Sequence, residues 1–567
     1  MDQPRPTRFR WWMPQLGLFG IAILLVIVAA SSVAGGASMP TRDSGWWALT
    51  LLLHLPFALI VVFVVGGLVE RIGFFWKGKA SEAPGRLPAV VPTVAVQLPM
   101  FNEHAVAERV IEAAAAMRWP RGRLRIHVLD DSTDDDTRAM VRAVAARVSA
   151  STGVPITVRQ RTDRRGYKAG ALEEDRKVTD AEFIAIFDAD FLPPRDFLYR
   201  AMPHFYLADG RPDEGLALVQ AQWGHLNHDE SALTRAQSLW VDDHHTLQMS
   251  WRSARWGFVN FTGTAGIWRA SAIEAAGGWR AASLVEDGEL SFRQLFAGYR
   301  TKFVKEIVTP AELPATYTAY KAQQKRWTQG WVQVQRLHLA TLLFRFSSGW
   351  PRRLHLLYHM CIGWQWPAWA VWITILPFMM LTGHWFGVLD PALGLAIYLL
   401  PSALWIAVAA TAASIETRHT YPGAITPASV LARLRRVVPY LAISTGMLPH
   451  QVSAFAEGLF GPMHTEFERT PKAASVTNGA STTVRPPTPR TYGVKVHWPY
   501  VLTEVAFVAY QAAWINLFVD RGMWLAALGA AYLGACVLAL ILQYGDHAGR
   551  VLFVVPRNWF EAAPASR

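Results

Sequence analysis

Residues 124–134 read Leu-Arg-Ile-His-Val-Leu-Asp-Asp-Ser-Thr-Asp, a short apolar stretch that ends in acidic and hydroxyl side chains. The apolar part predicts a buried strand over residues 124–129, and the chain beyond Asp134 has the spacing of an amphipathic helix. Upstream, residues 94–99 predict another strand, and residues 102–117 predict the helix that follows it. Strands and helices that alternate in this way predict the start of a parallel α/β sheet.

Carboxylates stand at the ends of the predicted strands. Asp130 and Asp131 fall at the carboxyl end of the second strand, where open α/β sheets collect their ligands. Residues 183–187 predict a third strand that runs into Asp188-Ala189-Asp190, and two carboxylates so close repel each other unless a cation lies between them. This region has no Cys/His cluster of zinc spacing, so the pair favours Mg²⁺ or Mn²⁺. Helix capping and ordinary turns are the alternatives.

Two later stretches place polar side chains at a helix start and on one helix face. Residues 260–266 form a loop of small residues, and residues 285–287, Val-Glu-Asp, open a helical stretch. Gln323, Arg326 and Trp327 stand at i, i+3 and i+4 of a predicted helix and so share a face. Arginine can bind a diphosphate through two hydrogen bonds, and tryptophan can stack on a sugar ring. A membrane-interface role is the alternative for the tryptophan, because the chain has 25 Trp.

The composition indicates a membrane protein with a water-soluble part. The 567 residues are 52% hydrophobic and 17% charged, which excludes a disordered chain. Apolar runs of about 20 residues are long enough to cross a bilayer, and they predict about six spans. These runs lie at residues 16–33, 46–68, 361–382, 392–413, 500–519 and 524–544. A signal sequence is the alternative for the first run, because basic residues precede it and small residues follow it.

Lysine and arginine beside the runs predict a multi-pass protein of the cell membrane whose N-terminus, soluble domain and C-terminus are cytoplasmic. Residues 437–460 are apolar but contain Pro439, His450 and Glu457, so we expect them at the interface or re-entrant. The expected organisation is two spans in residues 1–76, the soluble domain in 77–343, two spans plus an interfacial helix in 344–460, a cytoplasmic loop in 461–498, and two spans with a tail in 499–567.

The order of the polar motifs along the soluble domain resembles that of the processive family 2 glycosyltransferases, and most of all the cellulose-synthase-like mannan and glucomannan synthases. The stretches that carry the likeness are 97–103 (Gln-Leu-Pro-Met-Phe-Asn-Glu), 129–134, 166–172 (Gly-Tyr-Lys-Ala-Gly-Ala-Leu) and 263–266 (Gly-Thr-Ala-Gly). Residues 467–472, Phe-Glu-Arg-Thr-Pro-Lys, resemble the family's gating loop. The resemblance implies a GT-A fold, an α/β Rossmann-like domain that binds a nucleotide sugar and is inserted between transmembrane helices.

The resemblance also implies roles for the residues of these motifs. Asp287 would be the base that takes the proton of the acceptor hydroxyl, and Arg326 would neutralise the departing diphosphate. Asp188 and Asp190 would meet the metal and the diphosphate. Asp130 or Asp131, with Glu103 and Lys168, would hold the nucleoside of the donor. Gln323 and Trp327 would bracket the terminal sugar of the acceptor, and Thr470 and Lys472 would belong to the gating loop.

The expected activity is metal-dependent, inverting transfer of a hexose from UDP-glucose or GDP-mannose to a growing β-linked polysaccharide, which passes outward between the spans. A membrane lipid that receives one or a few sugars is the alternative acceptor. A transporter or receptor with a degenerate nucleotide-binding domain is the alternative from another class, but the spans hold few ionisable residues. The sequence departs from the family's pattern at two positions: Val285 stands where the family usually has Thr, and Arg469 where its gating loop has Val. These departures leave the identity of the donor and the mode of gating undecided.

The expected partners are the nucleotide sugar, the acceptor and membrane lipids. The net charge of +12 does not predict binding to nucleic acid, because the basic residues lie mostly beside the apolar runs. The sequence predicts no particular partner protein.

Overall fold

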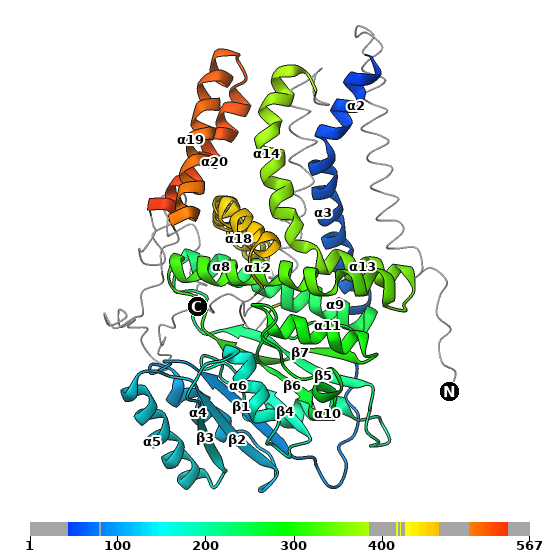
Figure 1. The fold of residues 1–567 in the computed structure, drawn as a ribbon, viewed down its shortest axis with the longest axis vertical. Coiled ribbons are helices and arrows are strands. Elements are labelled where there is room, and N and C mark those ends of the chain that lie inside the picture. Colours follow the sequence, from blue (N-terminus) through cyan, green and yellow to red (C-terminus); the bar gives the residue numbers. More distant parts are fainter. Residues whose placement is uncertain are drawn as a thin grey trace.

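The computed structural model describes residues 43–78, 81–384, 416–417, 420, 426–463 and 498–542. The expected spans at 16–33 and 392–413 and the expected gating loop at 467–472 lie outside these residues. The described part consists of a mixed sheet with helices on both faces and a group of apolar helices that extends away from it (Figure 1).

The sheet has seven strands in the order β3-β2-β1-β4-β6-β5-β7. Strands β1, β2 and β4 are parallel, as the sequence predicts, and β3, which the sequence did not predict, is parallel to β2. Strand β6 is antiparallel to both β4 and β5, so the whole sheet is mixed. Met100 of β1 pairs with Asp130 of β2, which brings the ends of these strands level. The bounds are β1 Val94–Met100, β2 Leu124–Asp130, β3 Ile156–Gln160, β4 Phe183–Ile186, β5 Leu216–His225, β6 Gly266–Arg269 and β7 Arg300–Ala311.

Helices cover both faces of the sheet and enclose two apolar cores. On one face α4, α5 and α7 pack on side chains of β1 and β2, and on the other α6, α10 and α11 pack on β4, β5 and β6. Burial of each large apolar side chain contributes about 1.5 to 3 kcal/mol, so these cores hold the sheet together. The bounds are α4 Ala107–Ala115, α5 Asp135–Thr152, α6 Tyr167–Arg176, α7 Phe197–Ala201, η4 Met202–Phe205, α10 Ala270–Ala275 and α11 Glu286–Phe296.

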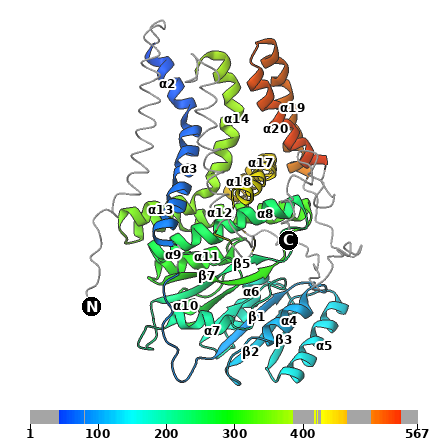
Figure 2. The ribbon, with the colours of Figure 1, turned by 180° about the vertical axis from the view of Figure 1, so that it is seen from behind.

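A layer of helices lies between the sheet and the apolar helices (Figures 1 and 2). In this layer α18 packs along α12, and α17 packs on α8. Residues 437–460 therefore form two helices, joined at Met447, and not one continuous run. The bounds are α8 Ala232–Asp242, η5 Asp243–Met249, α9 Ser250–Trp256, α12 Tyr317–Ala340, η6 Thr341–Arg345, α13 Trp350–Met360, η7 Ile362–Trp364, α16 Pro427–Arg435, α17 Val437–Gly446 and α18 Leu448–Phe460.

The apolar helices rise from one side of this layer. Within the described ranges two helical segments, Leu55–Gly78 and Trp498–Asp520, are long and apolar enough to cross a bilayer. The expected second span, residues 46–68, is divided into α2 and α3, which meet at His54, two residues before Pro56. The bounds are α2 Ser44–Leu53, α3 Leu55–Gly73, η3 Phe74–Gly78, α14 Gln365–Thr382, α19 Trp498–Asp520 and α20 Trp524–Leu542.

Candidate active site

The acidic motifs meet in one pocket at the carboxyl ends of the parallel strands. This follows from the topology, because β1, β2 and β4 run side by side and each continues into a polar loop at the same edge. Most of the residues expected from the sequence line the pocket: Glu103, Asp131, Lys168, Asp188, Asp190, Asp287, Gln323, Arg326 and Trp327. Residues between Glu103 and Trp327 thus supply one site from strand ends, loops and three helices, α6, α11 and α12.

Asp131, and not Asp130, faces the pocket. Asp130 is fully buried, where its carboxylate accepts hydrogen bonds from the Ser132 amide at 3.0 Å and the Gln160 amide group at 2.8 Å. Asp131 lines the pocket and accepts from Arg161 at 2.8 and 2.5 Å. The sequence left Asp130 and Asp131 as alternatives. In the structure, the Asp130 carboxylate stabilises the loop, and the Asp131 carboxylate faces the pocket.

Asn102 ties the loop after β1 to the loop after β2. Its Oδ1 accepts from the amides of Thr133 and Asp134 at 2.9 and 3.2 Å, and its own amide donates to Ser132 Oγ at 2.8 Å. Asn102 has a φ of 53°, a left-handed conformation that asparagine tolerates better than most residues. Asn102 therefore holds the loop that leads to Glu103 next to the acidic loop that follows β2.

Lys168 joins the first carboxylate of Asp188-x-Asp190 to the loop of small residues. Its Nζ donates to Asp188 Oδ1 at 2.6 Å and to the Gly263 carbonyl at 2.8 Å. Burial alone would lower the pKa of Lys168, but the charges of Asp188 and Glu286 outweigh it and raise that pKa above its ordinary value. Lys168 is therefore a charged group that holds Asp188 and the loop at a fixed separation.

Asp287 lies at the start of α11, beside the loop of small residues. Burial, followed by the charge of Glu286, raises the pKa of Asp287 to about 7, and the Gly288 amide donates to its Oδ1 at 2.8 Å. Gly263 has a φ of 84°, and a Cβ added to it would lie 3.0 Å from Asp287 Oδ2, so glycine permits both the turn and the approach. A buried carboxylate with a raised pKa is suited to accept a proton near neutral pH.

Helix α12 forms another wall of the pocket. Gln323, Arg326 and Trp327 all line it, as their shared helix face predicts. The Trp327 ring is nearly parallel to that of Trp240, with ring centroids 5.8 Å apart and planes 25° from each other. A pair of indole rings beside carboxylates suits a ligand that has both an apolar ring face and hydroxyl groups.

Several lining residues were not expected from the sequence. Arg164 lines the pocket with its guanidinium 3.3 Å from the centre of the Phe101 ring, and Trp223, Trp240 and Glu312 line other parts of it. The cluster of arginines at residues 161–165 was the available signal for Arg164. Thr470 and Lys472 lie outside the described residues, so their expected role stays a prediction.

The donor set of the pocket suits a hard divalent cation. No cluster of three or more His, Cys, Asp or Glu side chains with metal-binding geometry occurs in the part of the chain that the structure describes. Asp188 and Asp190 nevertheless both line the pocket, which holds more carboxylates than cationic side chains. Oxygen ligands with an excess of negative charge fit Mg²⁺ or Mn²⁺.

Comparisons with known proteins agree with this arrangement. Residues 92–330 match the model of the family described as glycosyltransferase like family 2. Glucomannan 4-beta-mannosyltransferase 1 of Oryza sativa subsp. japonica is 40% identical over 271 residues, which are 47% of this chain and 51% of that protein. Glucomannan 4-beta-mannosyltransferase 2 of Arabidopsis thaliana is 38% identical over 297 residues, or 51% of this chain and 54% of that protein. This chain thus spans about half the length of the curated relatives it matches.

Among solved structures, the mannosyltransferase PcManGT from Pyrobaculum calidifontis, in complex with GDP-Man and Mn²⁺, matches 72% of this chain and 99% of its own with a TM-score of 0.46 and 20% identity. The matched family region begins just before β1 and ends within α12, so it contains the whole sheet and every described motif residue of the pocket. We conclude that residues 92–330 form a family 2 glycosyltransferase domain with a GT-A-like α/β sheet, and that this chain is similar over about half its length to the glucomannan mannosyltransferases.

Proposed function

We propose that this chain is a membrane-integrated, inverting glycosyltransferase that transfers mannose from GDP-mannose to the growing end of a 4-β-linked polysaccharide. UDP-glucose is the second candidate donor. The observation that carries the proposal is the meeting of the acidic motifs with Gln323, Arg326 and Trp327 in one pocket. The names of the relatives, glucomannan 4-beta-mannosyltransferases, support the sugar and the linkage.

The proposed reaction needs a base, and Asp287 is suited to that role. Its carboxylate takes the proton of the acceptor hydroxyl as that oxygen attacks the anomeric carbon and the bond to the diphosphate breaks. The raised pKa of Asp287 places proton uptake near neutral pH. Attack from the face opposite the leaving diphosphate inverts the anomeric configuration.

Other side chains of the pocket bind the two substrates. Arg326 stabilises the negative charge that develops on the departing diphosphate, and Lys168 keeps Asp188 in place beside it. Asp188 and Asp190 would hold Mg²⁺ or Mn²⁺, which would neutralise the diphosphate when bound. Trp327 stacks on the terminal sugar of the acceptor, and Gln323 donates hydrogen bonds to its hydroxyls.

We further propose that the apolar helices insert the protein in the cell membrane several times, with the pocket on the cytoplasmic side. Leu55–Gly78 and Trp498–Asp520 support this, because each is long enough to cross a bilayer. The polymer would then leave the pocket between these helices as it grows.

The test uses the full chain in lipid vesicles with Mn²⁺ or Mg²⁺ and radiolabelled GDP-mannose or UDP-glucose. We expect a long product from GDP-mannose that a mannanase specific for 4-β linkages digests. Asp287→Asn should lower incorporation by about a thousandfold, in the middle of the range for general-base catalysis, while GDP-mannose still binds. Asp136→Asn, a change at an exposed position of α5, is the matched control and should retain full activity.

Two outcomes would overturn the proposal. Unchanged incorporation by Asp287→Asn would exclude Asp287 as the base. A short, solvent-extractable product would replace the polysaccharide with a lipid acceptor, with the same pocket chemistry.

A further inference from the structure

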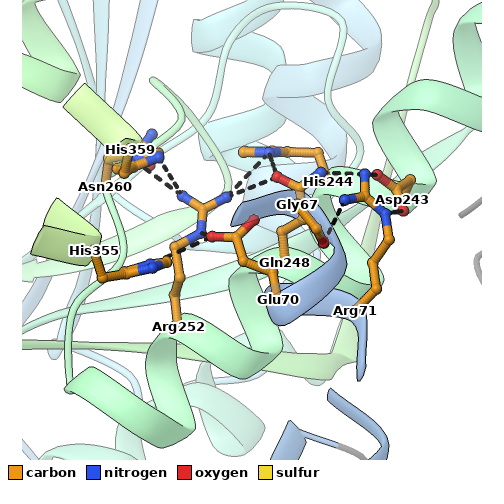
Figure 3. A network of polar contacts seen from close by, with 10 residues as sticks. All are labelled: Gly67, Glu70, Arg71, Asp243, His244, Gln248, Arg252, Asn260, His355 and His359. Atoms are coloured by element: carbon orange, nitrogen blue, oxygen red, sulfur yellow. Dashed lines mark hydrogen bonds and ion pairs between the residues drawn. The ribbon is translucent and has the colours of Figure 1, made fainter. Parts of the chain in front are cut away.

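A buried network of polar side chains connects the helix α3 to the loop of small residues beside Asp287 (Figure 3). It starts at the end of α3, crosses the helices η5 and α9, passes through α13 and ends at Asn260. None of its side chains lines the pocket. Its members are Gly67, Glu70, Arg71, Asp243, His244, Gln248, Arg252, Asn260, His355 and His359.

The part of the network at α3 consists of paired charges. Arg71 donates from Nε to Asp243 Oδ1 at 2.9 Å and from Nη1 to the Gly67 carbonyl at 2.8 Å. Arg252 Nε lies 3.1 Å from Glu70 Oε1, and these two residues are 2% and 1% exposed. Because a buried charge that loses its partner is costly, each pair fixes α3 against the helices beneath it.

His359 continues the network from Arg252 to Asn260. Arg252 Nη1 lies 3.0 Å from both ring nitrogens of His359, and His359 Nε2 lies 3.2 Å from Asn260 Oδ1. Nη1 is equally far from both ring nitrogens, so it lies over the ring and not on the in-plane lone pair of either nitrogen. Asn260 Oδ1 can only accept, so its contact with His359 is a hydrogen bond when Nε2 carries the proton. The Asn260 amide nitrogen donates to the Phe261 carbonyl at 3.3 Å, which fixes the orientation of the amide.

Burial and the charge of Arg252 lower the pKa of His359 well below its ordinary value, so the ring is neutral near neutral pH. In a neutral ring, the contact with Asn260 requires the proton on Nε2. His359 also contacts α12, because its ring stands edge-on to Trp331 at a centroid distance of 5.1 Å.

The segment that begins at Asn260 contacts the residues on both sides of the proposed reaction. The Phe261 amide donates to Ser291 Oγ at 2.8 Å, and Ser291 Oγ donates to the Asp287 carbonyl at 2.7 Å. Lys168 holds the Gly263 carbonyl, and the Asp188 amide donates to Thr264 Oγ1 at 2.9 Å. The position of this segment therefore sets the position of Asp287 relative to Lys168 and Asp188.

We propose that His359 is a positioning residue that holds residues 260–264 in place through Asn260, with Arg252 of α9 and Glu70 of α3 as its support. His359 touches neither substrate nor reacting atoms. It acts through the loop, which must keep Asp287 and Lys168 at a separation that suits both the acceptor and the diphosphate. The catalytic role of that loop rests on the function proposed above, whereas its dependence on His359 does not.

The test compares His359→Leu, which removes the polar contacts with Arg252 and Asn260, with His359→Gln, whose amide can still donate to the Asn260 oxygen. His204→Leu is the matched control, because His204 is also a buried histidine, lies beside Lys302 and Glu306, and is outside the lining of the pocket. All variants are studied as the full chain in lipid vesicles. Misplacement of reacting groups by about 1 Å lowers rates about a hundredfold, so we expect His359→Leu to lower kcat by about ten- to a hundredfold.

We expect the KM for GDP-mannose to stay within about threefold, because the donor's own ligands remain, and we expect His359→Gln to recover most of kcat. Hydrogen exchange gives a readout that needs no transfer activity: the amides of residues 261–264 should exchange faster in His359→Leu and not in His204→Leu. Asn260→Leu should lower kcat as His359→Leu does, and the double variant should be no worse than either single variant, because both changes break one contact.

The proposal is overturned if His359→Leu lowers kcat no more than His204→Leu at an equal loss of thermal stability. It is also overturned if the amides of residues 261–264 exchange no faster in His359→Leu than in the wild-type chain. A third contrary result is a double variant in which the losses of kcat from His359→Leu and Asn260→Leu add. Absence of transfer by the wild-type chain with both donors would instead contradict the proposed function, and the hydrogen-exchange comparison would still decide the role of His359.

Discussion

Asp287 is the group whose ionisation we expect to control the pH dependence of transfer. Burial and the charge of Glu286 raise the pKa of Asp287 from 3.8 to about 7. Only the ionised carboxylate can take the acceptor's proton, so activity should fall as the pH is lowered through about 7 and level off above it. The pH dependence of kcat/KM measures this ionisation in the free enzyme, and a constant rate between about pH 5 and 8 would contradict the assignment.

At the same scale, the sequence identified side chains that directly follow a strand better than contacts between residues far apart in the chain. Asp188 and Asp190 follow a strand directly, so their position depends only on where that strand ends. Arg161, in contrast, pairs with Asp131, which is 30 residues away in the sequence, and no local pattern predicts that contact. The choice between Asp130 and Asp131 also required the structure, because it depends on which neighbour the Gln160 side chain reaches.

At the scale of elements, Gly330 lets α12 approach the start of α11. A Cβ added at Gly330 would lie 2.8 Å from Val285 Cγ1 and 3.0 Å from the Val285 nitrogen. Alanine favours a helix over glycine by about 1 kcal/mol, so propensity alone would stabilise Gly330→Ala. We expect the opposite outcome for function: α12 shifts from α11 and moves Arg326 and Trp327 away from Asp287, which lowers kcat by about tenfold or more.

The control for this prediction is Gly529→Ala in α20, where an added Cβ would meet nothing within 4 Å. It should leave kcat unchanged and raise the melting temperature slightly. Full activity of Gly330→Ala, measured with the same donor and acceptor, would mean that α11 and α12 can separate without harm to the site.

The elements that the sequence predicted best are the strands and helices that repeat a simple pattern. β1, β2 and β4 end within a residue of their expected positions, because each is an apolar run closed by proline or acid. β6 has only four residues, follows a loop and reverses direction, so nothing in its sequence predicts an antiparallel strand in a parallel sheet. The π-helical segments η3, η5 and η6 also have no local signature, since tertiary contacts decide where a helix widens.

At the scale of the whole molecule, α12 connects the pocket to the apolar helices. Its Lys321 forms a buried ion pair with Glu504 of α19, and His450 of α18 lies 3.0 Å from the Lys321 carbonyl. Thr328 donates to Gln451 of α18 at 2.5 Å, one residue beyond Trp327. The helix that carries Arg326 and Trp327 is thus held by the part of the molecule that we propose lies in the membrane. Apolar composition predicted the helices but not these contacts, because the polar partners are isolated in the sequence.

The Lys321–Glu504 pair makes this connection testable. The side chains of Lys321 and Glu504 are 3% and 0% exposed, so Glu504→Leu would leave a buried ammonium group without its partner, at a cost of about 3 to 5 kcal/mol. Replacement of both groups by apolar side chains is often neutral, so Lys321→Met with Glu504→Leu should regain most of the melting temperature lost by Glu504→Leu alone. Asp180→Leu, which breaks an exposed pair with Arg125, is the control and should change the melting temperature little. Thermal unfolding of the full chain in vesicles measures all three, and a double variant no more stable than Glu504→Leu would mean that α12 and α19 are held together by other contacts.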